Sequence, residues 1–417
     1  MAGLSEGDVL DYVHSQSLIP GIARAISHGY ARDEQGNQIS RIGPRGNIQN
    51  RYRIVFADYG EPLATCTSVY QFLRVIHDAL SAQMNLWDCR AVIHRNICDD
   101  TIRMSVAASQ GHQAQTQYES QDLVAPYIKE LLDESVSSDD PNKIAECLIT
   151  DFEECVILVK EDMYEDARTR TGVPGFMARS VAQTKLLTSR RPMIFPAMPQ
   201  LPNTSTFEKY KAWNGFQGAG RYDRFYPATQ RMFAEYISGT YQSTQFRHHP
   251  FHDAESTLWV ISRWLVHAIP LNSQDIRSDS EAYKRICVAM YETSDETRPL
   301  FPAISDWRKF LHPGLSPELA VMLGEMHRYL QPEWALLRNE LRPDHAQEAL
   351  RRLVFKEIIR MKETGDFSPV SGHKRPIHVG VVPRAGSQGF LGSNYLMPDE
   401  LMHAIKELGL DVTSDAL

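Results

Sequence analysis

The sequence predicts an α+β fold, with strands near the amino terminus and mostly helices after them. Residues 51–57 (RYRIVFA) are rich in β-branched and aromatic side chains and end at a turn, which is typical of a strand. Residues 69–84 place apolar side chains at the i, i+3, i+4 and i+7 spacing of an amphipathic helix. A second stripe of this kind, in residues 350–361, indicates another helix near the carboxy-terminal end.

The first elements in chain order are a helix and a pair of strands. Ser5 and Asp8 have the spacing of a capping box, so a helix is expected to begin there and to stop before Pro20. Residues 34–50 are rich in Gly, Asn, Arg and Pro and predict a loop between two strands. Residues 58–62 predict a turn that leads towards the first long helix.

The middle of the chain contains two segments that look like insertions. A short apolar strand at residues 91–93 leads into the first motif discussed below. Residues 103–146 begin polar and Gln-rich and end in a probable linker at residues 136–142. Another short strand is expected at residues 147–149. Residues 186–247 are rich in Pro, Tyr and Phe and predict a second, irregular insert.

The most apolar stretch of the chain lies after the second insert. Residues 257–268 are apolar on most faces, which favours a buried helix. Arg263 and His267 interrupt this stretch, and it is shorter than the roughly 20 residues that a membrane span needs. After residue 365 the chain is rich in Pro and Gly, so residues 366–417 predict a flexible tail, with a short amphipathic helix at 398–408.

Composition and charge narrow the classes of function. The chain has 417 residues, 42% hydrophobic and 23% charged, which allows a core of ordinary size. Its net charge is −8 and its pI about 6.0, so we expect neither nucleic acid nor a membrane surface as a partner. The six cysteines are scattered and form no C-x-x-C pair, and no signal peptide is expected. A cytoplasmic or nuclear protein with an unknown protein partner is the resulting prediction.

Five short motifs carry the functional argument. In chain order they are residues 94–102 (HRNICDDTI), 148–153 (LITDFE), 170–178 (RTGVPGFMA), 252–256 (HDAES, with Trp259 after it) and the helix 345–361. They resemble, in the same order, the catalytic loop, the metal-binding triad, the end of the activation segment, the central helix and the closing helix of the fungal-type protein kinases. The resemblance covers residues 5–365.

The resemblance implies a protein-kinase-like fold for residues 1–365. A mostly helical carboxy-terminal lobe would carry the two inserts, and residues 1–62 would form the remnant of an amino-terminal lobe and the hinge. Glu6 would lie where such kinases have the Glu of a Lys–Glu ion pair. No lysine precedes Lys129, and no Gly-rich loop precedes the first helix. We therefore expect the clamp on the nucleotide phosphates to be incomplete.

The resemblance also implies roles for individual residues of the loop. Kinases use a loop Asp as base, an Asn five residues later and a second Asp as Mg²⁺ ligands, and ATP as phosphate donor. Asn96 occupies the base position, Thr101 the position of the Mg²⁺-binding Asn, and Asp151 that of the second metal ligand. His94 and Arg95 would orient the loop.

Two further candidates lie outside the loop. Asp253, at the start of the central helix, is expected to accept hydrogen bonds from backbone N–H groups of the loop and to hold its shape. Asp58, in the expected hinge, is a candidate contact for the nucleotide.

The departures from the family pattern predict weakened chemistry. An amide such as that of Asn96 cannot accept the substrate proton, and loss of a general base costs about 10²- to 10⁴-fold in rate. Val173 replaces a Thr and Ser180 a Glu, so the docking of the activation segment is expected to suffer. We expect a pseudokinase, with impaired or absent phosphoryl transfer from ATP to protein Ser/Thr. ATP and Mg²⁺, which the family implies, are expected to bind poorly. A residually active Ser/Thr kinase is the alternative.

A rival hypothesis from another class uses the histidines before the central helix. His248, His249, His252 and Asp253 lie close together in sequence, and imidazole and carboxylate groups bind divalent metals. This pattern is typical of metal-dependent phosphohydrolases. No partner His or Asp stands at helical spacing in the flanking helices, so the kinase-like interpretation is preferred.

Overall fold

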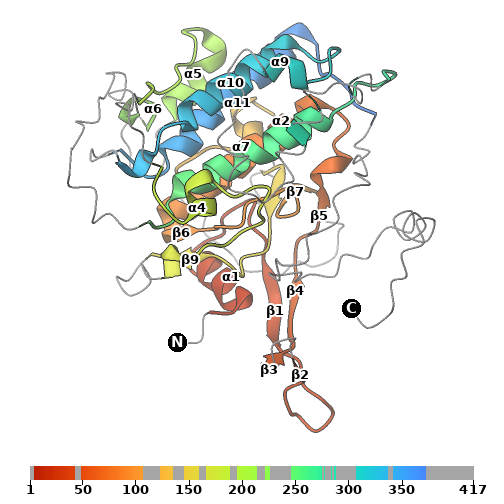
Figure 1. Ribbon diagram of the computed structural model, residues 1–417, viewed down its shortest axis with the longest axis vertical. Coiled ribbons are helices and arrows are strands. Elements are labelled where there is room, and N and C mark those ends of the chain that lie inside the picture. Colours follow the sequence, from red (N-terminus) through yellow and green to blue (C-terminus); the bar gives the residue numbers. More distant parts are fainter. Residues whose placement is uncertain are drawn as a thin grey trace. The chain divides into compact units, whose positions relative to one another are not determined.

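The computed structural model describes residues 4–42, 48–106, 123–134, 145–158, 166–187, 195–213, 221–225, 246–274, 277, 283, 286–287, 307–336 and 341–371. Its helices are α1 (Glu6–His14), α2 (Val69–Arg90), α3 (Ile128–Leu131), α4 (Arg179–Gln183), α5 (Ser205–Ala212), α6 (Arg221–Arg224), α7 (Pro250–His267), α9 (Trp307–Phe310), α10 (Pro317–Leu330) and α11 (His345–Thr364). Its strands are β1 (Ala25–Tyr30), β2 (Ser40–Ile42), β3 (Ile48–Asn50), β4 (Tyr52–Phe56), β5 (Gly60–Pro62), β6 (Val92–Ile93), β7 (Ile102–Ser105), β8 (Cys147–Ile149) and β9 (Val156–Ile157). The predicted α+β content is confirmed (Figure 1).

Helix α1 begins where the capping box predicted. The Ser5 hydroxyl accepts a hydrogen bond from the Asp8 backbone N–H (3.3 Å), and the Asp8 carboxylate accepts one from the Ser5 N–H (3.1 Å). These two bonds satisfy backbone N–H groups that a helix start otherwise leaves unpaired. The helix ends at His14, before Pro20, and buries Leu10 and Val13.

Strands β1 and β4 form an antiparallel ribbon, which β2 and β3 continue. The loop predicted for residues 34–50 is therefore wrong in part, because two short strands lie within it. A compact turn lies between β1 and β2, and Arg32 pairs with Gln38 across it. The Asp33 carboxylate accepts hydrogen bonds from the backbone N–H groups of Gln35 (3.0 Å) and Asn37 (2.8 Å). The chain thus reverses within a few residues, and the segments on either side can pair.

The long helices α2, α7 and α11 pack together and form most of the core (Figure 1). Phe72 of α2 and Trp264 of α7 stack with ring centres 4.0 Å apart and planes inclined by 4°. Helix α2 continues past the predicted end at residue 84 and stops at Arg90, where Ala91 turns into the left-handed region (φ 52°). Helix α7 contains the buried helix predicted at residues 257–268 but begins earlier, at Pro250.

Two small sheets fix the segment between β6 and β7. Strands β5, β7 and β8 form one sheet, in which Gly60 pairs with Ser105 and Ile102 with Ile149. Strands β6 and β9 form another antiparallel pair. The turn predicted at residues 58–62 therefore ends in a strand. Because β6 and β7 belong to different sheets, the loop that joins them is held at both ends.

Described parts of both predicted inserts pack on the helices. The buried Asp78 carboxylate of α2 accepts hydrogen bonds from the backbone N–H groups of Ile128 (2.7 Å) and Glu146 (2.8 Å). The buried Arg352 guanidinium of α11 donates to the carbonyls of Pro199 (3.1 Å) and Tyr222 (3.0 Å). The predicted linker at residues 136–142 lies outside the described residues.

The first residues after position 365 pair with the body. The Val69 N–H donates to the Ser368 carbonyl (3.1 Å), and the Leu271 N–H donates to that of Pro369 (2.8 Å). A separate unit, Arg375–Leu417, contains the helix predicted at 398–408 and lies outside the described residues. Within the described part of the chain, none of the helices has the length and apolar character needed to cross a bilayer.

Candidate functional site

The Asp253 carboxylate of α7 anchors the backbone of the loop between β6 and β7. One carboxylate oxygen accepts a hydrogen bond from the His94 backbone N–H (2.9 Å), and the other accepts one from the Arg95 N–H (3.0 Å). Burial raises the pKa of Asp253 to about 7, against the lowering effect of these two hydrogen bonds. The bonds hold Arg95 in the left-handed region (φ 68°), a conformation that costs a non-glycine residue about 1 kcal/mol or more. The loop therefore has one fixed shape.

His94 and Arg95 connect the loop to the segments beside it. The His94 ring packs edge-on against Phe152 (ring centres 4.7 Å apart), and its Nε2 lies 3.0 Å from the Thr150 carbonyl. Burial lowers the pKa of His94 to about 4, so the ring is neutral near pH 7. The Arg95 guanidinium donates to the Thr169 hydroxyl (2.6 Å) and carbonyl (3.1 Å). Both side chains are buried and serve packing and positioning.

Asn96 links three segments through its side-chain amide. Its Nδ2 donates to an Asp151 carboxylate oxygen (2.8 Å), and its Oδ1 accepts from the Val173 backbone N–H (3.1 Å). Burial, and then the nearby Glu153 carboxylate, raise the pKa of Asp151, while the Asn96 hydrogen bond opposes them. The amide thus presents a donor to Asp151 where an aspartate would present a second negative charge.

Thr101 closes the loop upon itself. Its hydroxyl donates to the Asn96 carbonyl (3.0 Å) and accepts from the Cys98 N–H (2.9 Å). Only 3% of the residue is exposed. The hydroxyl is therefore occupied by the loop backbone.

Glu6 and Asp58 both hold backbone. One Glu6 carboxylate oxygen accepts a hydrogen bond from the Phe152 N–H (3.0 Å), and burial raises the pKa of Glu6. Asp58 takes two parallel hydrogen bonds from the Arg24 guanidinium (2.9 and 2.6 Å) and one from the Arg24 N–H (3.0 Å). Asp58 therefore fixes the start of the β1–β4 ribbon, and its contact with a nucleotide stays a prediction.

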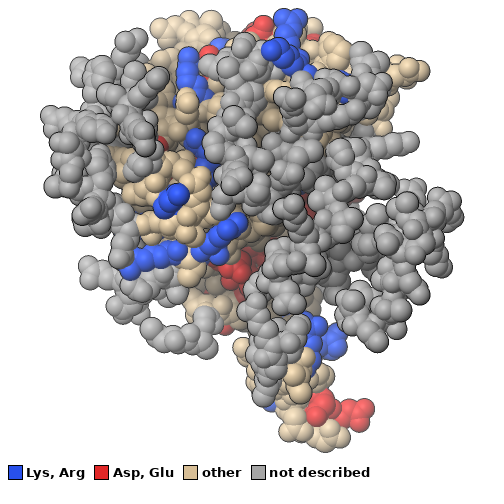
Figure 2. Space-filling view, in the orientation of Figure 1, with Lys and Arg blue, Asp and Glu red and all other residues tan. Residues whose placement is uncertain are grey.

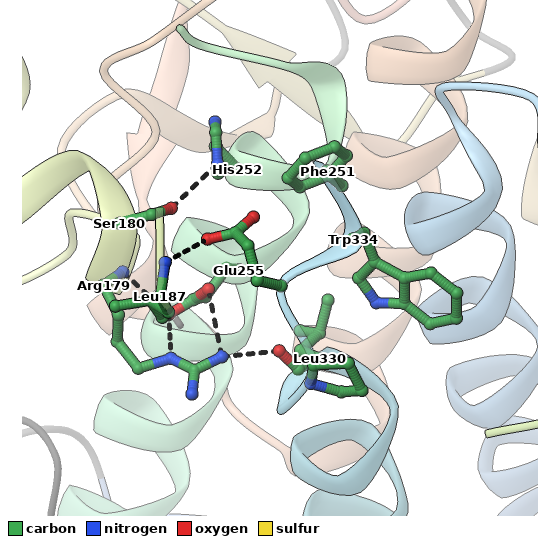
Figure 3. A pocket seen from close by; sticks show the side chains of 10 residues that line it. Arg179, Ser180, Leu187, Phe251, His252, Glu255, Leu330 and Trp334 are labelled. Carbon is green, nitrogen blue, oxygen red and sulfur yellow. Dashed lines mark hydrogen bonds and ion pairs between the residues drawn. The ribbon is translucent and has the colours of Figure 1, made fainter. Parts of the chain in front are cut away.

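The segment that resembles the end of an activation segment is anchored by Arg179. This residue precedes Ser180, which departs from the family pattern. Arg179 of α4 pairs with Glu255 of α7 (2.8 Å) and also donates to the Leu330 carbonyl (2.5 Å), as Figure 3 shows. The Ser180 hydroxyl lies 2.9 Å from His252 Nε2. Together with Trp334 these side chains line a small pocket. Arg179 provides a buried ion pair beside Ser180, and the effect of Ser180 on docking stays a prediction.

The histidines of the rival hypothesis do not converge on a common point. His252 Nδ1 accepts from the His249 backbone N–H (2.9 Å), and its Nε2 lies against Ser180. Asp253 is directed to the loop backbone. Burial lowers the pKa of both His248 and His249 to about 3. Among the residues that the structure describes, no three His, Cys, Asp or Glu side chains are placed to share a metal ion.

Sequence reasoning missed two contacts of the loop region. The guanidinium carbon of Arg263 in α7 lies 4.9 Å from the centre of the Phe176 ring, and its Nη1 lies 3.8 Å from an Asp99 carboxylate oxygen. It therefore ties the activation segment to the catalytic loop. The Thr171 hydroxyl donates to Glu154 (2.5 Å). The only sequence signal for Arg263 was its position as a charged residue inside a buried helix.

A family model described as fungal protein kinase matches residues 25–266, which is more than half of the chain. The match spans the loop, the Asp151 segment and all but the last residue of α7. No curated protein matches the chain. The chain belongs to the fungal protein kinase family.

Proposed function

We propose that this chain is a pseudokinase: a kinase-like protein that does not transfer phosphate from ATP to protein Ser or Thr. The observation that carries the proposal is the placement of the Asn96 amide. It donates to Asp151 and accepts from Val173, so the group at the base position serves as a structural link between loops.

Proton transfer is the first step that this arrangement lacks. A general base must accept the proton of the attacking hydroxyl, and it contributes about 10²- to 10⁴-fold to the rate. An amide is not basic near neutral pH, and the Asn96 oxygen already accepts the Val173 N–H. His94 cannot substitute, because it is buried and faces the Thr150 carbonyl.

Metal binding is the second step that this arrangement lacks. Mg²⁺ prefers an octahedral set of oxygen ligands, of which kinases supply two side chains. Asp151 offers a carboxylate, one oxygen of which is hydrogen-bonded to Asn96, and the Thr101 hydroxyl is used by the loop backbone. The described residues therefore do not fit the donor set that Mg²⁺–ATP needs, and no catalytic step is assigned to that group.

What the arrangement supports is a rigid, kinase-like body that acts through contacts with other proteins. Asp253, Arg95 and the Arg179–Glu255 pair hold the loop and the activation segment in place. A surface of fixed shape binds a partner without the entropic cost of ordering loops.

The proposal is tested by phosphate transfer from γ-labelled ATP to a Ser/Thr peptide library in the presence of Mg²⁺. We expect no transfer above background for the native chain or for Asn96→Asp, and no rise of the melting temperature with Mg²⁺–ATP. Transfer by the native chain that disappears in Asp151→Asn would show instead a residually active kinase. Transfer that appears only in Asn96→Asp would show that the base alone was lost.

We further infer a cytoplasmic or nuclear location. All six cysteines are free, and four of them are buried, which is the pattern of reduced core thiols. Secretion of the expressed chain with intermolecular disulfides would contradict this inference.

A further inference from the structure

Two buried acidic side chains share the pocket beside α4 with one arginine. Arg179 of α4, Glu255 of α7 and Glu333, which follows α10, all line the pocket shown in Figure 3. Only 7% of Glu255 and 3% of Glu333 are exposed. Arg179 is the one Lys or Arg among the described residues that line this pocket. With both carboxylates ionised, the pocket would hold two negative charges against one positive charge.

The two carboxylates differ in their hydrogen bonds. One Glu255 oxygen accepts from the Arg179 backbone N–H (2.9 Å) and from its guanidinium Nε (2.8 Å). One Glu333 oxygen accepts from the Leu187 N–H (3.2 Å), and the other accepts from the Ala335 N–H (3.4 Å). Hydrogen bonds to an ionised carboxylate are usually about 2.7–2.9 Å long. The lengths thus mark Glu255 as the charged partner of Arg179, and Glu333 as the carboxylate that gains less from a charge.

The charged and titratable groups around Glu333 come from four helices: Arg179 (α4), His252 and Glu255 (α7), His327 (α10) and His345 (α11). Burial lowers the pKa of all three histidines, to about 4 for His327 and about 3 for His345, so their rings are neutral near pH 7. Burial raises the pKa of Glu333 to about 7; Glu255 adds to this rise, and the two backbone hydrogen bonds and Arg179 oppose it. Figure 2 shows further Lys and Arg side chains on the surface around α4, but solvent screens exposed charges.

Glu333 joins two segments that are far apart in sequence. The Leu187 N–H donates to Glu333, and the Arg179 guanidinium donates to the Leu330 carbonyl (2.5 Å), so residues 179–187 are tied to residues 330–336. If these segments separate, water reaches the Glu333 carboxylate and solvates its charge. The closed arrangement therefore binds a proton on Glu333 more tightly than an open one does.

We propose that Glu333 is a proton-operated latch between residues 179–187 and residues 330–336. With a proton on a Glu333 carboxyl oxygen the latch is closed, and loss of this proton to water makes opening more frequent. The closed form remains the main one between pH 5 and pH 8, and only the frequency of opening changes. The latch goes beyond the pseudokinase proposal and does not depend on the catalytic loop.

The direction of the effect follows from proton linkage. In an open, solvated segment Glu333 has its ordinary pKa of 4.5, against about 7 in the closed form. Protonation thus favours the closed form fully below pH 4.5, and this contribution is lost as the pH rises to about 7. We expect the equilibrium constant for opening to be about 50-fold larger at pH 8 than at pH 5.

The test measures amide hydrogen exchange of the full chain by mass spectrometry between pH 5 and pH 8, corrected for the intrinsic exchange rate at each pH. Peptides that contain Leu187 and Ala335 report opening, and a peptide from the middle of α2 is the internal reference. We expect protection in the two reporter peptides to fall about 50-fold over this range relative to the reference. Protection that does not change with pH would overturn the proposal.

Variants with a matched control assign the effect to Glu333. Glu333→Gln keeps the shape of the side chain but cannot ionise, so the pH dependence should fall below about threefold, whatever happens to overall stability. Glu255→Gln removes the neighbouring charge and leaves Arg179 to Glu333, so the dependence should fall below about tenfold. Glu357→Gln removes a buried glutamate of α11 that pairs with Arg360 outside the pocket, and it should behave as the native chain does.

Each variant also has a result that contradicts the latch. The full native pH dependence in Glu333→Gln would assign the effect to another group. If Glu333→Gln does not fold, Glu255→Gln decides, because an unchanged dependence there would mean that the pocket charge does not control the proton. Loss of the dependence in Glu357→Gln would show a change of the whole fold and would equally overturn the proposal.

Discussion

The loop between β6 and β7 contains two regions whose side chains have different roles. At its start, His94 and Arg95 are buried and held by two hydrogen bonds to Asp253 and by packing on Phe152. Further along, Asn96 and Thr101 stand where we propose that the family's base and Mg²⁺-binding residues lie, and both are engaged in links within the protein. The start of the loop is held in shape by hydrogen bonds to its backbone. The departures from the family pattern lie further along, where we propose that a side chain of an active kinase takes part in the reaction.

This difference teaches that the fold and the chemistry of such a site are supported by different groups. The anchors act on backbone N–H groups, which every residue except proline possesses, so they tolerate a change of side chain at the next position. The chemistry depends on side-chain oxygens at defined points, and we propose that the amide of Asn96 and the engaged hydroxyl of Thr101 remove it.

The largest effect should come from the anchor. Asp253→Ala leaves two buried N–H groups without acceptors, and we expect a loss of roughly 2–5 kcal/mol in the free energy of unfolding. Asp253→Asn keeps one acceptor oxygen and should lose about half as much. Urea unfolding measures both. Equal stability of Asp253→Ala and the native chain would contradict the anchoring role.

The position of the anchor was foreseeable, and that of the docking contact was not. The HDAES motif placed Asp253 at a helix start, where a carboxylate reaches backbone N–H groups, and the Ser5 capping box likewise set the start of α1. In the sequence, Ser180 in place of the family's Glu suggested that the activation segment loses a contact that docks it. The Arg179–Glu255 pair beside it depends on how α4 lies against α7, and no local pattern contains that information.

Two features of the structure could not be predicted from the spacing of apolar side chains in the sequence. The short strands β2 and β3 have too few residues to show an alternation of side chains, so composition favoured a loop. The direction of the Asn96 amide depends on Asp151 and Val173, which are far away in sequence. The motif predicted which group stands at the base position, and only the fold shows what it touches.

The buried histidines should make the frame sensitive to acid. The pKa of His248 is about 3 in the folded chain, against an ordinary 6.5, so below pH 6.5 the unfolded chain binds a proton that the folded chain does not. Stability from this group is fully present above pH 6.5 and falls as the pH drops towards 3. Between pH 7 and pH 5 it accounts for about 2 kcal/mol.

His248→Phe isolates this contribution. Burial raises the pKa of Asp253 to about 7, which acts in the opposite direction, but that term is common to both proteins and cancels. We expect the difference in unfolding free energy between pH 7 and pH 5 to be about 2 kcal/mol smaller in His248→Phe than in the native chain. An unchanged difference would show that His248 titrates normally.

Replacing Asn96 with aspartate should have a smaller effect on the free energy of unfolding. Asn96→Asp puts two carboxylates in contact, and we expect it to lose about 1–2 kcal/mol at pH 7 and less at pH 5, where the pair shares a proton. The raised pKa of Asp151 favours that protonation. Asn96→Ala, which adds no charge, should lose a similar amount at both pH values. A more stable Asn96→Asp at pH 7 would argue against the link.

The most direct test of the central claim is the coupling between Asn96 and Asp151. Unfolding free energies of Asn96→Ala, Asp151→Ala and the double variant give the interaction energy of the pair. A hydrogen bond to a charged group predicts a coupling of about 1.5–3 kcal/mol. Changes that add within about 0.5 kcal/mol would mean that the amide does not hold Asp151, and that the base position has not become a structural link.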